Sequence, residues 1–299
     1  MSFRARSGFC YQKLLPRKIK KNYPLANRAV PSDSSLRDLV PPRPMAEKLI
    51  DNYLNTFGRT HRLFHYPTFR EKLASFWEDD DQFGDDWFAQ LFSALALGCH
   101  ALPPDTCYAE HDFMNIIETC LDAAAVALQR ENYMAKPSLE TIRAMCLMVI
   151  AKQAMPSIFG DSDDLWTLMG SIVRAAMMAA LHRDSKWFPS MPMLESEERR
   201  RIWNTVLLLS IETAMESGMP PLIHASQFDT AAPTNVDDID LPLHDDCDLV
   251  AQSVDTYTDS LLQIRLAAAY PTVLAVVEIM NTTGGDIDVQ KASEYEREI

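Results

Sequence analysis

The stretch LWTLMGSIVRAAMMAALHRD, residues 165–184, decides the fold class of this protein. Its large apolar residues recur every three or four positions, which is the spacing of one face of an α-helix. These residues are Trp166, Met169, Val173, Met177 and Leu181. Asp163 and Asp164 stand immediately before this stretch and are predicted to cap the helix. The stretch therefore predicts a long amphipathic helix.

The same periodicity extends to both sides of this stretch. Further helices are predicted from Pro44 to Gly58 and, after a packed loop at 61–69, in a short segment that ends at Trp77. Others are predicted from Asp85 or Asp86 to Gly98, over 108–130, from Ser138 onward, over Glu195–Met215, and from about 255 past Pro271 to Met280. Sustained strand alternation is missing from the sequence, and no period of 20–50 residues marks a repeat. The predicted fold is all-α, a multi-helix domain.

Composition agrees with an ordinary globular protein, with 47% hydrophobic and 23% charged residues. No uninterrupted apolar run approaches the roughly 20 residues that span a bilayer, so no membrane segment is expected. Six cysteines are scattered along the chain, several inside apolar helical patterns. We expect reduced, buried thiols and an intracellular protein.

The charge is divided unevenly along the chain. Residues 1–32 hold eight of the 28 basic residues and no acid, so the other 20 basic residues share the rest of the chain with all 42 acids. Such an acidic body repels the phosphates of nucleic acids. Residues 1–43 are interpreted as a flexible basic and Pro/Ser lead-in. Within it Arg17, Lys18, Lys20 and Lys21 are a candidate nuclear-import patch, and a basic tail without special function is the alternative.

Four stretches of sequence resemble the fungal-specific transcription factor domain, the middle homology region of binuclear zinc-cluster transcription factors. They are LIDNY with FHYPTF at 49–53 and 64–69, SLETIRA at 138–144, LWTLMGSIVRAAMMAALHRD at 165–184, and EERRRIW at 197–203 followed by GMPPLI at 218–223 and PTNVDD at 233–238. Arg143 stands where the family usually has Gln, and Met219 where it usually has Arg. The resemblance covers about residues 45–299.

The resemblance implies a regulatory domain over residues 44–299, expected to be truncated at its C-terminus. The family's DNA-binding module needs six closely spaced cysteines for two zinc ions. Only Cys10 precedes residue 99, so neither that zinc cluster nor direct DNA binding is expected in this chain. The family-motif residues expected to form the scaffold are Trp166, Arg174, His182, Arg183, Asp184, Arg200, Arg201, Trp203, Gly218 and Pro220.

The chemistry of these motif residues points to packing and ion pairing. Trp166 and Trp203 supply large apolar areas, and Arg199 to Arg201 lie within helical reach of Glu195, Glu197 and Glu198. Arg174 is expected to reach a carboxylate across a helix interface. Gly170 is expected to let another backbone approach closely. Asp237 and Asp238 are expected to bond to backbone groups in their loop.

Three groups of His, Cys and Asp residues have side chains that can bind metal ions, but none has the spacing of a known metal-binding motif. Cys99, His100, Cys107 and His111 have permissible zinc-ligand chemistry, but their spacing matches no common finger, and buried thiols with surface imidazoles are favoured. His61 and His65 lack the Glu of a zinc-protease motif, because Arg62 follows His61; a packed loop is favoured. Asp161 and Asp163 begin a calcium-like loop that Leu165 breaks, so helix capping is favoured.

An all-α enzyme that binds magnesium is the rival class, with Asp79 to Asp81 and Asp85 to Asp86 as candidates. Phe83 stands where an Asp-Asp-x-x-Asp motif needs its last acid. Phosphate-binding, dinucleotide-binding and nucleophile-elbow motifs are not present in the sequence. The methionines of residues 169–178 are interpreted as core.

Two hypotheses follow. The first is a nuclear, non-enzymatic transcription regulator that controls metabolic or secondary-metabolite genes. Its partners would be other transcription regulators, a homologous full-length factor, or a small-molecule effector. It predicts apolar packing around the motif helices and no titratable cluster. The second is an all-α enzyme or small-molecule-binding protein, cytoplasmic or nuclear, with a pocket where Arg174, His182 or Arg183 converge.

Overall fold

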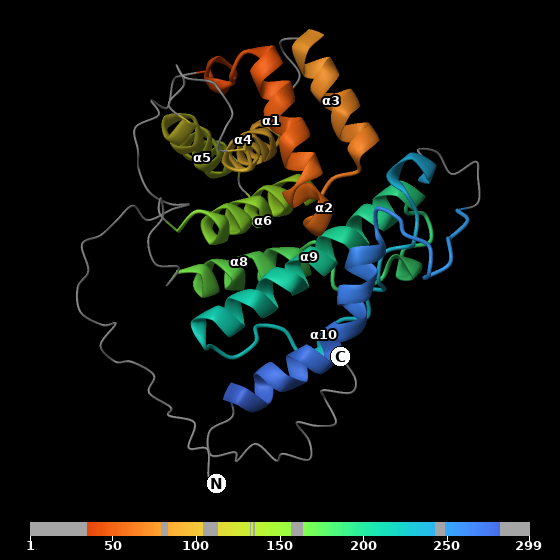
Figure 1. Cartoon of the computed structure of the whole chain (residues 1–299). Coiled ribbons are helices and arrows are strands. Elements are labelled where there is room, and N and C mark those ends of the chain that lie inside the picture. The colour runs from red at the N-terminus through yellow and green to blue at the C-terminus, as the bar shows by residue number, and fades with distance from the viewer. Residues whose placement is uncertain are drawn as a thin grey trace, which may run out of the picture.

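The computed structural model of the chain describes residues 35–78, 83–103, 113–131, 133, 135–156, 164–242 and 249–281. Throughout these ranges the regular elements are helices, and none is a strand (Figure 1). The all-α prediction is confirmed. The α-helices are α1 (Arg43–Asn55), α2 (Phe57–His61), α3 (Tyr66–Glu78), α4 (Asp85–His100), α5 (Phe113–Arg130), α6 (Leu139–Ala154), α8 (Leu165–Met178), α9 (Met193–Ser217) and α10 (Leu261–Asn281). The short 3-10 turns are η2 (Leu36–Leu39), η3 (Ser185–Trp187), η4 (Ala225–Gln227) and η5 (Asp238–Asp240).

Helix ends follow the expected chemistry in some places only. Ser138 caps α6 in a reciprocal box with Thr141, and Gly218 ends α9 in the left-handed conformation at φ 62°. Asp164 makes no capping hydrogen bond to α8; its carboxylate instead pairs with Lys152. Gly58 does not end the first helix, because α1 stops at Asn55 and Gly58 lies inside α2.

The first half of the fold is built around α4, which packs on α1, α5 and α6. Residues 87–99 of α4 are all buried, so this helix is apolar on every side. Gly98 lies against the backbone of α1: a Cβ placed there would come within 1.9 Å of the Leu49 carbonyl oxygen. The Asn52 side-chain amide donates to the Gly98 carbonyl over 2.8 Å. Gly98 therefore permits a very close crossing of α1 and α4.

The second half is built around α9, which packs on α8, α10 and α6 (Figure 1). Helix α6 contacts both α4 and α9 and joins the two halves. Trp203 and Val206 of α9 are fully buried, as expected for the apolar stripe. The same helix also buries charged groups, among them Glu197 and Arg201.

Helix α10 is long and apolar enough to cross a membrane by length and composition, although no membrane span was expected. Only 22% of its most apolar window is buried. Its buried residues Tyr270, Leu274 and Val277 nevertheless belong to the domain core, and the Tyr270 hydroxyl donates to the Asn204 carbonyl of α9. Pro271 lies inside the helix. Helix α10 is therefore anchored in the helical fold.

The end of the expected lead-in is folded against the domain. Leu36 is buried, and the Arg37 guanidinium donates to the Phe76 carbonyl oxygen over 2.8 Å while lying 4.3 Å from the centre of the Phe76 ring. The import patch, Arg17, Lys18, Lys20 and Lys21, lies outside the described residues.

Candidate functional site

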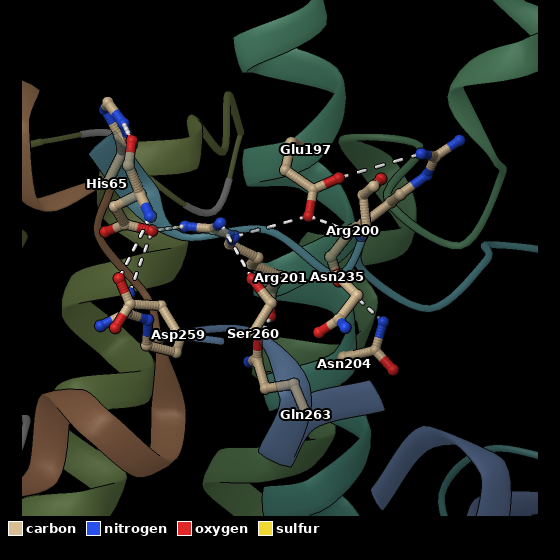
Figure 2. A network of polar contacts seen from close by, with 12 residues as sticks. His65, Glu197, Arg200, Arg201, Asn204, Asn235, Asp259, Ser260 and Gln263 are labelled. Carbon is tan, nitrogen blue, oxygen red and sulfur yellow. Dashed lines mark hydrogen bonds and ion pairs between the residues drawn. The ribbon is translucent and has the colours of Figure 1, made fainter. Parts of the chain in front are cut away.

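A buried polar network joins α9 to the loop of residues 228–242 and to the segment that leads into α10 (Figure 2). At its centre Arg201 of α9 bonds with Nη1 to Asp238 Oδ1 over 2.6 Å and with Nη2 to Ser260 Oγ over 3.1 Å. Both Arg201 and Asp238 are more than nine-tenths buried. The charge of each is therefore neutralised inside the protein rather than by solvent.

Arg62 brings the first half of the fold into this network. It follows α2 in the left-handed conformation, at φ 38°, which is uncommon for a residue other than glycine. Its Nη2 lies 3.1 Å from Asp238 Oδ1 and 2.7 Å from Asp259 Oδ2, and its guanidinium stacks 4.2 Å from the centre of the Tyr66 ring. The backbone conformation of Arg62 directs its fully buried guanidinium toward two carboxylates, and those contacts offset the strain of that backbone conformation.

Glu197 and Arg200 extend the network along α9. Glu197 Oε1 accepts from the Thr234 amide over 2.9 Å and lies 3.6 Å from Arg201 Nε. Arg200 donates two hydrogen bonds to Asp184, from Nε to Oδ2 over 3.0 Å and from Nη2 to Oδ1 over 3.2 Å. Asp184 Oδ2 also accepts from the Ala231 amide. These contacts fix the 228–242 loop to α9.

Neutral side chains complete the network. His65 Nε2 lies 2.8 Å from the Asp238 carbonyl oxygen, and the Tyr66 amide donates to Asp238 Oδ2. Asn235 binds three backbone carbonyls of residues 252–256 through Nδ2, and its Oδ1 accepts from Thr258. Gln263 of α10 donates to the His61 carbonyl oxygen over 2.9 Å. Asp237 and Asp238 do accept from backbone amides, but not from those of their own loop as expected: Asp237 accepts from the Asp259 amide, and the Tyr66 amide that Asp238 binds lies at the start of α3.

The pKa shifts show which charges the network stabilises. Burial alone would raise the pKa of Asp238, but Arg201 and Arg62 outweigh it and the pKa is lowered. Burial likewise opposes ionisation of Asp184, yet the bonds from Arg200 and from the Ala231 amide lower its pKa to about 2. Burial dominates at Glu197 and raises its pKa despite Arg201. Burial lowers the pKa of His61 to about 4.

This arrangement suits a structural clamp better than a reaction centre. Its carboxylates are held by arginine side chains and backbone amides, and arginine does not exchange protons near neutral pH. No group of three His, Cys, Asp or Glu residues within the described parts of the chain could hold a metal ion. The expectation of no titratable cluster was wrong: a buried cluster exists, and its ion pairs link α9 to Asp184 and Asp238 and link Arg62 to Asp238 and Asp259.

Most of the motif residues help to hold the second half together. Trp203 is fully buried and its ring meets the Phe228 ring edge-on at 5.7 Å between centres. The Trp166 indole donates to the Pro220 carbonyl oxygen over 3.1 Å, so α8 holds the chain just after Gly218. The His182 carbonyl accepts from the Asp229 amide.

Arg174, His182 and Arg183 do not converge on a common site. Arg174 is exposed and donates to the Gly170 carbonyl oxygen of its own helix over 2.7 Å, so the expected carboxylate partner was wrong. Gly170 faces the Arg174 and Leu222 side chains and not another backbone. That close approach occurs at Gly98 instead. Arg183 is half exposed, with Nη1 lying 3.8 Å from Asp229 Oδ2.

The metal candidates are only partly within the described residues. Cys107, His111, Asp79 to Asp81, Asp161 and Asp163 lie outside them. Cys99, Cys120 and Cys146 are buried free thiols, as expected, and burial raises the pKa of Cys99 to about 11. His61 and His65 lie at the end of α2 and in the packed loop after it. Asp85 and Asp86 lie in the first turn of α4, whose N-cap is Gly84.

Sequence reasoning missed the residues that complete the network from distant segments. Arg62, Asp259, Ser260 and Gln263 were not singled out. The charged Arg62 stands immediately before the apolar pair Leu63 and Phe64, and that was the one available signal. A charge that becomes buried requires a partner, but the sequence does not say which residue that partner is.

The fold and the network define an all-helical scaffold held by buried ion pairs, and most of the motif residues take part in its packing or its ion pairs. The chain belongs to the fungal specific transcription factor domain family, whose model matches residues 50–264. That range begins in α1 and ends in α10, and it contains the whole network.

Curated relatives carry names that agree with this family. Transcription factor asR3 of Sarocladium schorii is 26% identical over 80% of this chain and 28% of its own length. Zn(2)-C6 fungal-type transcription factor mpsB of Macrophomina phaseolina is 26% identical over 82% of the chain and 33% of its length. Fusarisetin A cluster transcription factor fsa6 of a Fusarium species is 26% identical over 67% of this chain and 28% of its own length. The chain thus spans about a third or less of these relatives. No solved structure matches it.

Proposed function

We propose that this chain is the regulatory region of a fungal transcription regulator of the zinc-cluster type, formed by residues 44–299, and that it has no enzymatic activity. One observation carries this proposal: the family match covers residues 50–264, and the motif residues inside it hold helices together. A reaction centre would instead need titratable groups that are free to act on a substrate.

The proposed partners are other transcription regulators or a homologous full-length factor. A chain with net charge −14 is a poor ligand for DNA phosphates, so contacts with proteins are the proposed route of action. The proposed targets are metabolic or secondary-metabolite genes, in line with the cluster named for the relative fsa6. A small-molecule effector bound between the helices stays a prediction.

Deletion of the gene in its source fungus, followed by transcript sequencing, tests the regulatory role. We expect a group of biosynthetic genes to change together in transcript level. Unchanged transcripts with accumulation of one pathway intermediate would contradict the proposal and favour the enzyme alternative. A second strain carrying the native gene on a plasmid controls for secondary mutations.

A fusion to a fluorescent protein tests the proposed nuclear location. We expect nuclear fluorescence for the unsubstituted chain and a more cytoplasmic distribution after Lys20→Ala and Lys21→Ala in the import patch. The same substitutions at Lys48 and Lys136, two lysines outside that patch, provide the control. Cytoplasmic fluorescence of the unsubstituted chain would favour the alternative location.

A further inference from the structure

We propose that the basic segment of residues 1–32 docks on an apolar and acidic surface of the same chain. The apolar side chains of this surface, called here the Tyr257 surface, are those of Ile239, Val250, Val254 and Tyr257. They belong to η5 and to the segment 249–260, which leads into α10. The contact rests on exposure, charge and reach, and it does not depend on the proposed regulatory function.

The apolar side chains of the Tyr257 surface are open to solvent. Ile239 is 81% exposed, Tyr257 78%, Val250 75% and Val254 55%. The two segments that carry them are joined, because the Asp259 amide donates to Asp237 Oδ1 over 2.9 Å and the Asp238 amide donates to Asp259 Oδ2 over 3.1 Å. Apolar side chains that are exposed together and rimmed by polar groups mark interaction sites.

The backbone of the Tyr257 surface is held in place by Asn235. The buried Asn235 side-chain amide donates to the Ser253 carbonyl over 2.6 Å and to the Thr256 carbonyl over 3.2 Å. The Asn235 carbonyl accepts from the Gln252 amide over 2.8 Å. These bonds fix the chain on both sides of Val254. A surface that is already formed loses little conformational entropy when it binds.

The Tyr257 surface lies in an acidic part of the chain. Residues 236–260 contain eight Asp and neither Lys nor Arg. Two of these acids, Asp238 and Asp259, are offset by the buried arginines Arg62 and Arg201 of the network. The other six are Asp237, Asp240, Asp245, Asp246, Asp248 and Asp255, of which the three at 245–248 lie outside the described residues.

Cations of the neighbouring helices do not balance this charge. Arg265 of α10 is exposed and donates through Nη2 to the Val254 carbonyl over 2.9 Å. Arg59 of α2, a helix that contacts α10, is also exposed. Helix α3, which contacts η5, carries two cations and two acids and adds no net charge. The described acids Asp237, Asp240 and Asp255 alone outnumber Arg59 and Arg265, so the surface favours a basic occupant.

Residues 1–32 have the complementary composition. They contain eight Lys and Arg and no acid, and large apolar residues lie among these cations. The apolar residues include Phe3, Phe9, Tyr11, Leu14, Leu15, Ile19, Tyr23 and Leu25. A second copy of the acidic body or a DNA duplex would instead bring further negative charge to the Tyr257 surface.

The basic segment is attached within reach of the surface. Arg37 donates to the Phe76 carbonyl of α3, and the Tyr66 amide at the start of α3 donates to Asp238 in η5. A rise of about 1.5 Å per residue places these two contacts about 15 Å apart along α3. The chain from Lys21 to Ser35 spans up to roughly 45 Å when extended. Attachment to the same chain also gives the segment a high effective concentration at the surface.

One consequence of docking rests on the proposed function. Residues 17–21 hold the candidate nuclear-import patch, and docking would withhold this patch from an import receptor. Docking itself is measured on the purified chain, so its failure is distinct from a failure of the proposed regulatory role.

Carbodiimide crosslinking of the purified whole chain tests the contact, because this reagent joins an amine to a carboxylate only where the two are already close enough to pair. We expect the monomer to give amide links, located by mass spectrometry, from Lys13, Lys18, Lys20 or Lys21 to Asp240 or Asp255. Tyr257→Ala keeps every carboxylate and should lower the yield of these links. Met178→Ala removes an exposed apolar side chain at the end of α8 and should not.

Trypsin cleavage after Lys20 and Lys21 gives a second readout. A synthetic peptide of residues 1–32 supplies the cleavage rate of the free segment. We expect slower cleavage in the whole chain, and about threefold faster cleavage once Asp240→Asn and Asp255→Asn together remove two surface charges. Glu78→Gln removes an exposed acid at the far end of α3 and should leave the rate unchanged. Thermal melting shows whether each variant retains its fold.

Cleavage of the whole chain at the rate of the free peptide would overturn the proposal. Links from these lysines only to other carboxylates, or only between two molecules, would also overturn it. Equal effects of Glu78→Gln and of the double Asp variant would do the same, because the charge of the Tyr257 surface would then not guide the segment.

Discussion

Helices α4 and α9 occupy equivalent central places in the two halves of the molecule, yet they are packed by opposite means. Helix α4 is surrounded by apolar side chains and meets the backbone of α1 directly at Gly98. Helix α9 is held on one side by apolar packing and on another by arginine–carboxylate pairs with Asp184 and Asp238. Asp238 in turn pairs with Arg62. Apolar packing is non-directional and tolerant, whereas buried ion pairs demand particular partners in particular positions. Single substitutions in the ion pairs of the second half should therefore destabilise the fold more than substitutions of surface charges in the first half.

Arg201→Ala should give the largest loss, about 3–5 kcal/mol of unfolding free energy, because it leaves Asp238 and Glu197 buried with fewer positive partners. Urea denaturation at neutral pH measures it. Arg201→Lys should fall between this variant and the unsubstituted chain, since it keeps the charge and loses the planar pair of bonds. A loss below about 1 kcal/mol would mean that the network does not hold α9 in place.

Gly98→Ala should cost about 3 kcal/mol, near the upper end for overpacking, because the added Cβ overlaps the Leu49 carbonyl and forces α1 and α4 apart. Gly84→Ala is the matched control: the nearest atom to its added Cβ belongs to the Asp86 side chain and not to backbone. Similar denaturation midpoints for the Gly98 and Gly84 variants would contradict the close crossing.

Arg200→Gln should cost about 2 kcal/mol at neutral pH by removing two charged hydrogen bonds from Asp184. The lowered pKa of Asp184 means that its contribution is present above the unfolded pKa of about 3.9 and is lost as pH falls toward 2. Denaturation midpoints measured from pH 5 to pH 2 should therefore depend less on pH in the variant. An unchanged slope would show that Asp184 does not draw its low pKa from Arg200.

His61 provides a separate pH window. Its pKa is lowered to about 4 by burial, so the neutral ring is favoured in the folded state. Stability should fall as pH drops from about 6.5, the unfolded pKa, toward 4. His61→Gln should flatten the profile in this window and leave the lower window unchanged. If the His61→Gln variant keeps the full slope of stability against pH, that slope belongs to another titrating group.

The N-cap of α6 should matter less. Ser138→Ala should cost about 1 kcal/mol, because the Thr141 amide loses its acceptor. Ser138→Asp keeps an acceptor at this position and should restore most of the loss. Thermal melting of the two variants compares them directly, and equal melting temperatures would remove Ser138 as the cap.

Arg70→Ala should have the smallest effect, from about 0 to 0.5 kcal/mol. Arg70 pairs with Asp51 at 2.8 Å, but both side chains are 53% exposed. This surface pair in the first half is the counterpart of the buried pairs in the second half. A loss as large as that of Arg201→Ala would contradict the distinction between them.

Much of the fold could be predicted from the sequence, because helix signals are local. The periodicity of residues 165–184 places α8, and Ser138 and Gly218 mark the ends at which α6 begins and α9 stops. Pairing within α9 was also predictable, since Glu195 and Arg199 are four residues apart on one helix. The motif residues were assigned to a scaffold from the family resemblance and not from helix periodicity.

The sequence by itself determined the helical class, the approximate helices and the residue types that would need burial or a partner. Only the tertiary structure decided which partners they have. Arg62 meets Asp238 across more than half of the chain, and Gly98, not Gly170, receives a neighbouring backbone. Helical periodicity records which residues share a face, whereas contacts between distant segments depend on how the helices cross. Those crossings are set by the packing of all the helices together, so no single stretch of sequence contains them.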